Sequence, residues 1–114
     1  MSMPDAHVFD EYLARSDDEL LAELGKELIG SGLGVGSSDP GRARRFTLKW
    51  LDEKREELCT RDEVREMAMN PAGERVIEMA TLVELLSEDV SQTAAIMAAV
   101  LIYRIGLRSF CAGF

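Results

Sequence analysis

The sequence predicts an all-α fold, a single domain over residues 1–114 in which about five helices pack around an apolar C-terminal helix. The segment 93–103, TAAIMAAVLIY, is apolar almost all the way round and contains no carboxylate, and a helix of that composition must be buried. The rest of the chain is rich in Leu, Ala, Glu and Met and poor in β-branched and aromatic residues, which favours helix over strand. A chain of 114 residues is long enough to bury a substantial core.

The first predicted helix covers residues 17–29. Ser16 to Glu19 form a capping box, in which the serine oxygen accepts a hydrogen bond from a free helix N–H and the glutamate reaches back. Acidic residues alternate with apolar ones at helical spacing. The apolar positions are Leu20, Leu21, Leu24, Leu28 and Ile29. Upstream of the cap, a short helical turn is expected to pack against this helix through Val8, Phe9, Tyr12 and Leu13.

The segment 30–41, GSGLGVGSSDPG, predicts a flexible connecting loop, because its glycines lift most restrictions on φ. It lacks the Gly-Lys-Ser/Thr ending of a phosphate-binding Walker loop, since Gly36 is followed by two serines. A dinucleotide-binding fingerprint would need glycine at position 35, which is Val35. We therefore expect a connector, with Leu33 and Val35 as candidate partner-binding residues.

A long helix is predicted over residues 40–59, with Asp39 as its N-cap and Pro40 at its first position. Its buried side is expected to consist of Ala43, Phe46, Trp50, Leu51 and Leu58. Its first half carries the most basic stretch of the chain, which consists of Arg42, Arg44, Arg45 and Lys49. These residues form either a patch for an anionic partner such as nucleic acid or the counterpart of the acidic N-terminal helix. The net charge of −8 favours the second interpretation.

Three further helices are predicted over residues 61–69, 72–86 and 92–107. Thr60 to Glu63 read as a second capping box, and Ser91 is the expected N-cap of the apolar helix. The helix pair 61–69 and 72–86 resembles a helix-turn-helix in outline only. Its second helix carries three glutamates against Arg75, so phosphate would repel it. The tail is expected to fold back on the core or meet another chain through Phe110, Cys111 and Phe114.

No catalytic, cofactor-binding or metal-binding motif is recognisable. The single histidine, His7, has no partner at a spacing that supports nucleophile activation or a metal site, so we expect no enzyme activity, no cofactor and no metal. The acidic N-terminus lacks the pattern of a secretory signal, and helix 92–107 is too short to span a bilayer. Two distant cysteines, Cys59 and Cys111, are expected to be buried thiols, and the expected location is the cytoplasm.

These observations favour a small non-enzymatic, acidic protein-interaction module, such as an adaptor, a regulator or an immunity-type inhibitor. One alternative is a regulator that binds nucleic acid or another anion through the basic stretch 42–49. Another is a structural subunit whose apolar C-terminal helix completes a homo-oligomeric bundle. We expect a protein partner and consider nucleic acid and membrane unlikely partners. The candidate partner-binding residues are Leu33, Val35, Arg42, Arg44, Arg45 and Lys49.

Overall fold

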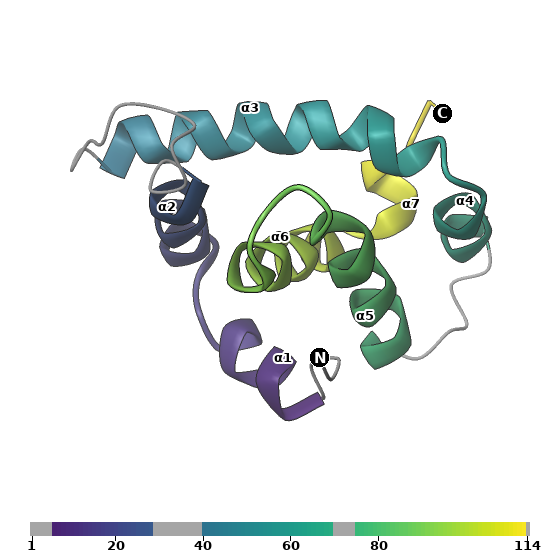
Figure 1. Ribbon diagram of the computed structural model, residues 1–114, viewed down its shortest axis with the longest axis horizontal. Helices are drawn as coiled ribbons and strands as arrows, with labels where there is room; N and C mark the ends of the chain where they lie inside the picture. The colour runs from purple at the N-terminus through teal and green to yellow at the C-terminus, as the bar shows by residue number, and fades with distance from the viewer. Residues whose placement is uncertain (1–5, 29–39, 70–74, 114) are drawn as a thin grey trace.

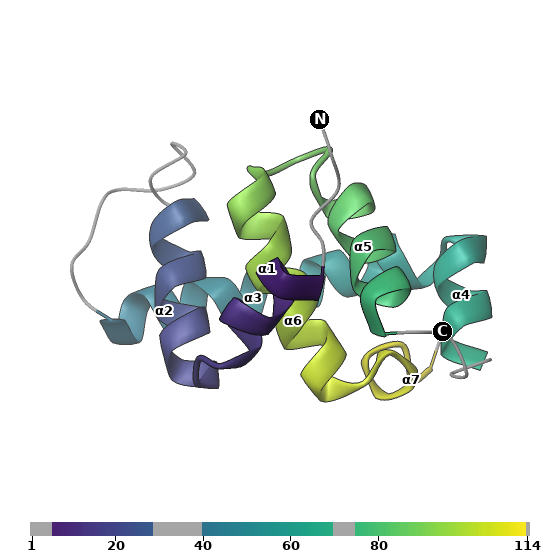
Figure 2. The same cartoon turned by 90° about the horizontal axis from the view of Figure 1, so that it is seen from below.

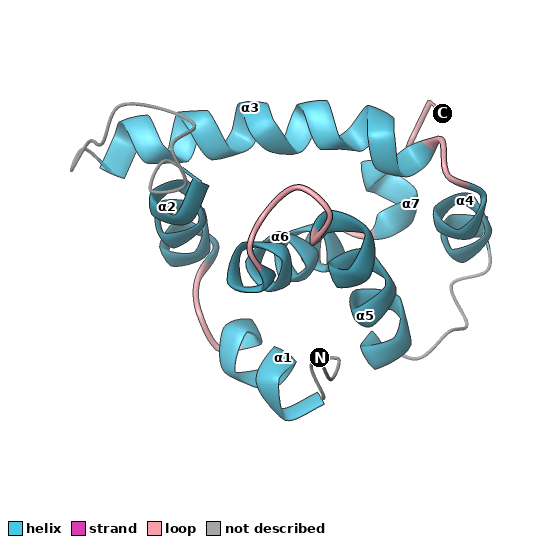
Figure 3. Ribbon diagram, viewed as in Figure 1, coloured by secondary structure: helices cyan, strands magenta, loops and turns pink. Residues whose placement is uncertain are grey.

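The computed structural model describes residues 6–28, 40–69 and 75–113, and these residues form seven helices and no strand (Figure 1, Figure 3). The all-α prediction is confirmed. The helices are α1 (Ala6–Leu13), α2 (Asp17–Leu28), α3 (Pro40–Cys59), α4 (Asp62–Met69), α5 (Arg75–Leu86), α6 (Gln92–Ile105) and α7 (Leu107–Phe110). Helices α2 to α6 correspond to the five predicted ones, and α1 is the expected upstream turn. Pro40 and Gly41, where the predicted loop and the predicted helix overlap, belong to α3.

Helix α6 is the centre of the molecule, as its composition predicts. It lies between α2 and α5, and it also contacts α1 and α7 (Figure 2). Every residue from Ala94 to Ile102 is buried, and the alanines among them let neighbouring helices approach closely. None of the described helices combines the length and the apolarity that a membrane crossing requires.

The end of α6 differs from the prediction. The helix stops at Ile105, because Gly106 adopts a positive φ of 91° and its N–H donates to the carbonyl oxygens of Ile102 and Tyr103. Ile105, which the predicted apolar helix 92–107 includes, does not belong to the core, since this residue is 51% exposed. The turn at Gly106 instead redirects the chain so that Leu107 and Phe110 of α7 are buried.

Three of the four predicted N-terminal caps lie among the described residues and have different outcomes, and the fourth, Asp39, lies outside them. Ser16 Oγ accepts a hydrogen bond from the Glu19 N–H at 3.2 Å, and Ser91 Oγ accepts one from the Ala94 N–H at 3.2 Å. Thr60 does not open α4 as predicted, because its hydroxyl lies 2.9 Å from the carbonyl oxygen of Glu56 and donates backward. A threonine hydroxyl can bond to the carbonyl four residues earlier as well as to a following N–H, and here it closes α3.

Helices α2 and α3 cross at very close range. A Cβ atom placed on Gly25 would lie 2.7 Å from the carbonyl oxygen of Ala43, so only glycine fits at this position. Thr47 is fully buried beside it, and its Oγ1 lies 2.8 Å from the Ala43 carbonyl and 3.0 Å from that of Leu21. The crossing therefore satisfies a buried hydroxyl through backbone oxygens of both helices.

Arg104 ties the end of α6 to the turn between α1 and α2. Its Nη1 donates to Asp17 Oδ1 at 2.7 Å, and its Nη2 donates to the carbonyl oxygen of Leu13 at 2.6 Å and to that of Arg15. The carbonyls at the end of α1 have no partner within their own helix, and a charged donor satisfies them here.

The two cysteines form a disulfide between the end of α3 and the residue after α7. Cys59 and Cys111 have a Cα–Cα distance of 5.4 Å and are separated by 52 residues in the sequence. The expectation of two buried thiols is therefore wrong, although both residues are buried as expected. Their sequence separation concealed the pairing, because only the turn at Gly106 brings the tail back to α3.

Candidate partner-binding sites

The predicted basic stretch lies on the exposed side of the first half of α3, which runs along the upper edge of Figure 1. Arg44 Nη1 lies 3.1 Å from Asp18 Oδ1 of α2, so one of the four residues makes the expected contact with the acidic helix. The side chains of Arg42, Arg45 and Lys49 make no ion pair within the part of the chain that the structure describes. The structure thus leaves three exposed cations on one helix.

The second half of the same side of α3 is acidic. Helical spacing continues the line of Arg42, Arg45 and Lys49 into three exposed carboxylates, those of Asp52, Glu53 and Glu56. We call these six residues the dipolar face, because they are positive toward the start of α3 and negative toward its end. A nucleic-acid backbone along α3 would be attracted by one half and repelled by the other.

The other two predicted site residues, Leu33 and Val35, lie outside the described residues, as does most of the segment 30–41.

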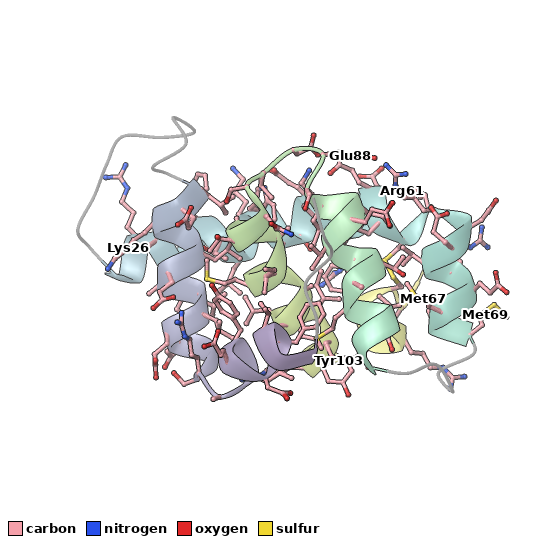
Figure 4. All side chains as sticks on the ribbon, turned by 60° about the horizontal axis from the view of Figure 1, so that its bottom comes forward. Lys26, Arg61, Met67, Met69, Glu88 and Tyr103 are labelled. Carbon is pink, nitrogen blue, oxygen red and sulfur yellow. A yellow bond between two sulfur atoms is a disulfide. The ribbon has the colours of Figure 1, made fainter. Side chains whose placement is uncertain are left out.

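A second candidate site is a groove of about 280 Å³ between α4 and the end of α7. Its floor contains the disulfide and Ala68, and Met69 at its edge is 78% exposed. Figure 4 shows Met69 at the outer end of α4, pointing away from the ribbon. The groove is lined by Cys59, Arg65, Ala68, Met69, Arg108, Cys111 and Ala112.

The groove combines apolar atoms with two arginines. Arg65 comes from α4 and Arg108 from α7, both are exposed, and neither makes an ion pair with any residue the structure describes. Apolar lining favours burial of an apolar group, and free guanidinium groups favour a carboxylate beside it. Sequence reasoning missed this site, because it exists only where the disulfide brings α7 beside the end of α3. An exposed methionine at a helix end was the one available signal.

A smaller polar hollow, of about 200 Å³, separates the second half of α3 from the end of α5. Its charged residues satisfy one another: Lys54 Nζ lies 2.5 Å from Asp89 Oδ2 and 2.8 Å from Glu57 Oε2. Arg61 Nη2 lies 3.2 Å from Glu88 Oε2, and Figure 4 shows these two side chains near each other. This cluster holds the turn after α5 against α3.

The ion pair of Lys54 and Asp89 shifts both acid–base equilibria. Partial burial of Lys54 opposes its charge, but hydrogen bonds to Asp89 and Glu57 outweigh that effect and raise its pKa. The same hydrogen bond lowers the pKa of Asp89 below its ordinary value. Both groups are therefore charged at neutral pH, and the charged residues that line the hollow are paired with one another.

Within the described ranges, no three side chains of His, Cys, Asp or Glu gather in a way that would hold a metal ion. Comparison of the chain with protein-family models, with curated proteins and with solved structures finds no match.

Proposed function

We propose that the protein is a small non-enzymatic helical module that binds a partner protein through the groove between α4 and α7. The observation that supports this function is the pair Arg65 and Arg108, which have no ion-pair partner among the described residues and flank an apolar floor. Interfaces are enriched in arginine and methionine, and Met69 at the edge adapts readily to different side chains.

The groove favours a particular kind of partner segment. Its volume of about 280 Å³ is close to the lower limit of the range of about 300–1,000 Å³ that is typical of small-molecule sites, so it accommodates an apolar side chain more readily than a large cofactor. Two arginines beside that side chain favour a neighbouring aspartate or glutamate. The proposed ligand is therefore a peptide segment in which an apolar residue stands next to one or two carboxylates.

Selection of a random peptide library displayed on phage tests this function. We expect the wild-type protein to enrich peptides with a large apolar residue flanked by Asp or Glu. The variant Arg65→Glu/Arg108→Glu should lose these peptides while its helical circular dichroism stays unchanged. The matched control, Arg42→Glu/Arg45→Glu, has the same change in charge on another surface and should retain them. Enrichment of non-acidic peptides, or equal binding by both variants, would exclude this groove as the binding site.

The alternative of nucleic-acid or anion binding through the basic stretch 42–49 has less support. The stretch is followed by Asp52, Glu53 and Glu56 on the same side of α3, and the whole chain has a net charge of −8. At physiological ionic strength a charge acts over about 8 Å, so these carboxylates weaken the field at the nearest bases. The alternative in which helix 92–107 completes a bundle of several copies also has less support, because Ala94 to Ile102 are buried within one chain.

The proposed location needs a test of its own. Disulfides persist in oxidising compartments, which argues against the cytoplasmic location that the sequence suggests. We propose a stable Cys59–Cys111 bond in the protein's native setting. Cells should be quenched rapidly and their thiols alkylated under denaturing conditions, since both cysteines are buried in the folded chain. Both cysteines should stay unmodified, whereas alkylation of both would favour the cytoplasmic location.

A further inference from the structure

We propose that the dipolar face of α3 is a self-complementary surface at which two copies of the chain pair in antiparallel orientation. This inference is independent of the groove between α4 and α7 and concerns a different side of the molecule. The basic half of the face in one copy would contact the acidic half in the other. The partner is thus a second copy of this chain.

The first argument is the arrangement of like charges within one copy. Arg45 lies three residues from Arg42 and four from Lys49, and Asp52 lies four from Glu56. Residues at these spacings are neighbours on a helix surface, and like charges there repel. Of the six residues, Asp52 alone makes a contact with an opposite charge among the described residues, since its Oδ1 lies 3.3 Å from Arg55 Nη1. A second molecule with the opposite charge facing each half would therefore reduce the repulsion within both halves.

The second argument is that the two halves match under a two-fold axis. A two-fold axis that lies between the two copies of α3, level with the point midway between residues 50 and 51, places Arg45 opposite Glu56 of the second copy and Lys49 opposite Asp52 of the second copy. Symmetry produces each of these pairs twice. Residues 45 and 56 are about 16 Å apart along a helix that rises 1.5 Å per residue, and antiparallel pairing preserves that spacing.

The third argument is accessibility and the choice of partner. Helix α3 forms one edge of the molecule (Figure 1). The other described helices lie on the side of α3 that faces away from this edge (Figure 1). A nucleic acid satisfies only the basic half of the dipolar face and is repelled by the other half. A basic peptide is attracted by the acidic half and repelled by the basic half. A second copy carries both signs at the required spacing, so charge complementarity selects it.

The pairing is expected to be weak and sensitive to salt, because all six side chains are exposed. The net charge of −8 on each copy opposes pairing at 0.01 M ionic strength, where charges act over about 30 Å. At physiological ionic strength charges act over about 8 Å, which reduces this overall repulsion while the facing charges still attract. In sedimentation velocity at roughly millimolar protein, we expect a dimer at physiological ionic strength. Its dissociation constant should rise at least about tenfold at 1 M ionic strength, where screening acts over about 3 Å.

Two charge-swapped variants test the register. Arg45→Glu/Lys49→Glu makes the face wholly acidic apart from Arg42, and Asp52→Lys/Glu56→Lys makes it basic apart from Glu53. Each variant alone should be monomeric at physiological ionic strength, because like faces repel. An equimolar mixture of the two should form a one-to-one heterodimer, since every swapped residue then faces an opposite charge.

A control of equal net charge separates this interface from the effect of the overall charge of the molecules. Arg65→Glu/Arg108→Glu and Arg45→Glu/Lys49→Glu both change the net charge from −8 to −12. Mixed with Asp52→Lys/Glu56→Lys, the groove variant should form no one-to-one heterodimer, and on its own it should dimerise like wild type. A monomeric wild type at physiological ionic strength would overturn the proposal. So would equal association of both acidic variants with the basic one, given unchanged circular dichroism.

Discussion

The centre of the molecule and the corner formed by α4 and α7 are held together in different ways. At the centre, α6 is buried along nine consecutive residues and is packed between α2 and α5. At the corner, α4 buries Val64 and Ala68, and the four-residue helix α7 buries Leu107 and Phe110. Two short helices with so little buried surface contribute little free energy of folding by packing. Here the disulfide joins the residue after α7 to the end of α3, just before α4 begins.

This difference bears on function as well as on stability. The proposed groove lies in the corner, and a covalent bond crosses its floor. A binding site gains affinity when its walls are already in place before the ligand arrives. The disulfide provides that order where apolar packing is sparse.

The strongest way to break the centre is Val100→Asp. Val100 is fully buried in α6, and an unpaired carboxylate there costs more than about 4 kcal/mol, which removes most of the stability of a domain near the lower end of the ordinary range of about 5–15 kcal/mol. We expect loss of the cooperative thermal transition or aggregation. The matched control is Ile105→Asp on the same helix, where the side chain is 51% exposed and the melting temperature should change little. A folded Val100→Asp variant would contradict the central position of α6.

Removal of the disulfide breaks the corner. In the chain-entropy model, closing a loop of 52 residues stabilises a protein by about 4 kcal/mol, so Cys59→Ser/Cys111→Ser should lower the free energy of unfolding by about that amount. Hydrogen exchange should then show the larger loss of protection in α4 and α7 and the smaller one in α6. Equal loss across all helices would mean that the bond supports the centre as much as the corner.

The crossing of α2 and α3 tests how tightly the region around the centre is packed. Gly25→Ala places a methyl group against the Ala43 carbonyl and should destabilise the domain by about 1–3 kcal/mol, more than the roughly 1 kcal/mol that alanine gains over glycine in a helix. Lys26→Ala on the exposed side of α2 is the control and should have little effect. A higher melting temperature for Gly25→Ala would show that the two helices can separate at small cost.

The smallest expected effect is that of Glu78→Gln in α5. Burial raises the pKa of Glu78, so the folded state holds its proton more tightly than the unfolded state does. Its contribution is thus most favourable below the ordinary glutamate pKa and declines as the pH rises through the raised value. Glu78→Gln should stabilise the domain by less than about 0.5 kcal/mol at pH 7 and have no such effect near pH 3. Equal melting temperatures of wild type and Glu78→Gln at pH 7 would show that burial of this carboxylate does not destabilise the domain.

Much of the local structure follows from the sequence. The leucines of α2, the apolar side of α3 and the composition of α6 predict both the helices and their buried sides, since residues three and four apart share a helix face. The Ser16 and Ser91 caps are predictable for the same reason, because each joins residues three positions apart. The exposed positions of Arg42, Arg45 and Lys49 follow from this periodicity too.

Tertiary structure alone decided the contacts between distant residues. The Cys59–Cys111 bond, the hydrogen bonds of Arg104 to the end of α1 and the approach of Gly25 to Ala43 all depend on how the helices turn relative to one another. The groove beside Met69 depends on the turn at Gly106, which also leaves Ile105 exposed. Helical periodicity reports which side of a helix is buried, because that depends on neighbours within one turn. It does not report which residues of another helix cover that side, because this depends on the path of the whole chain.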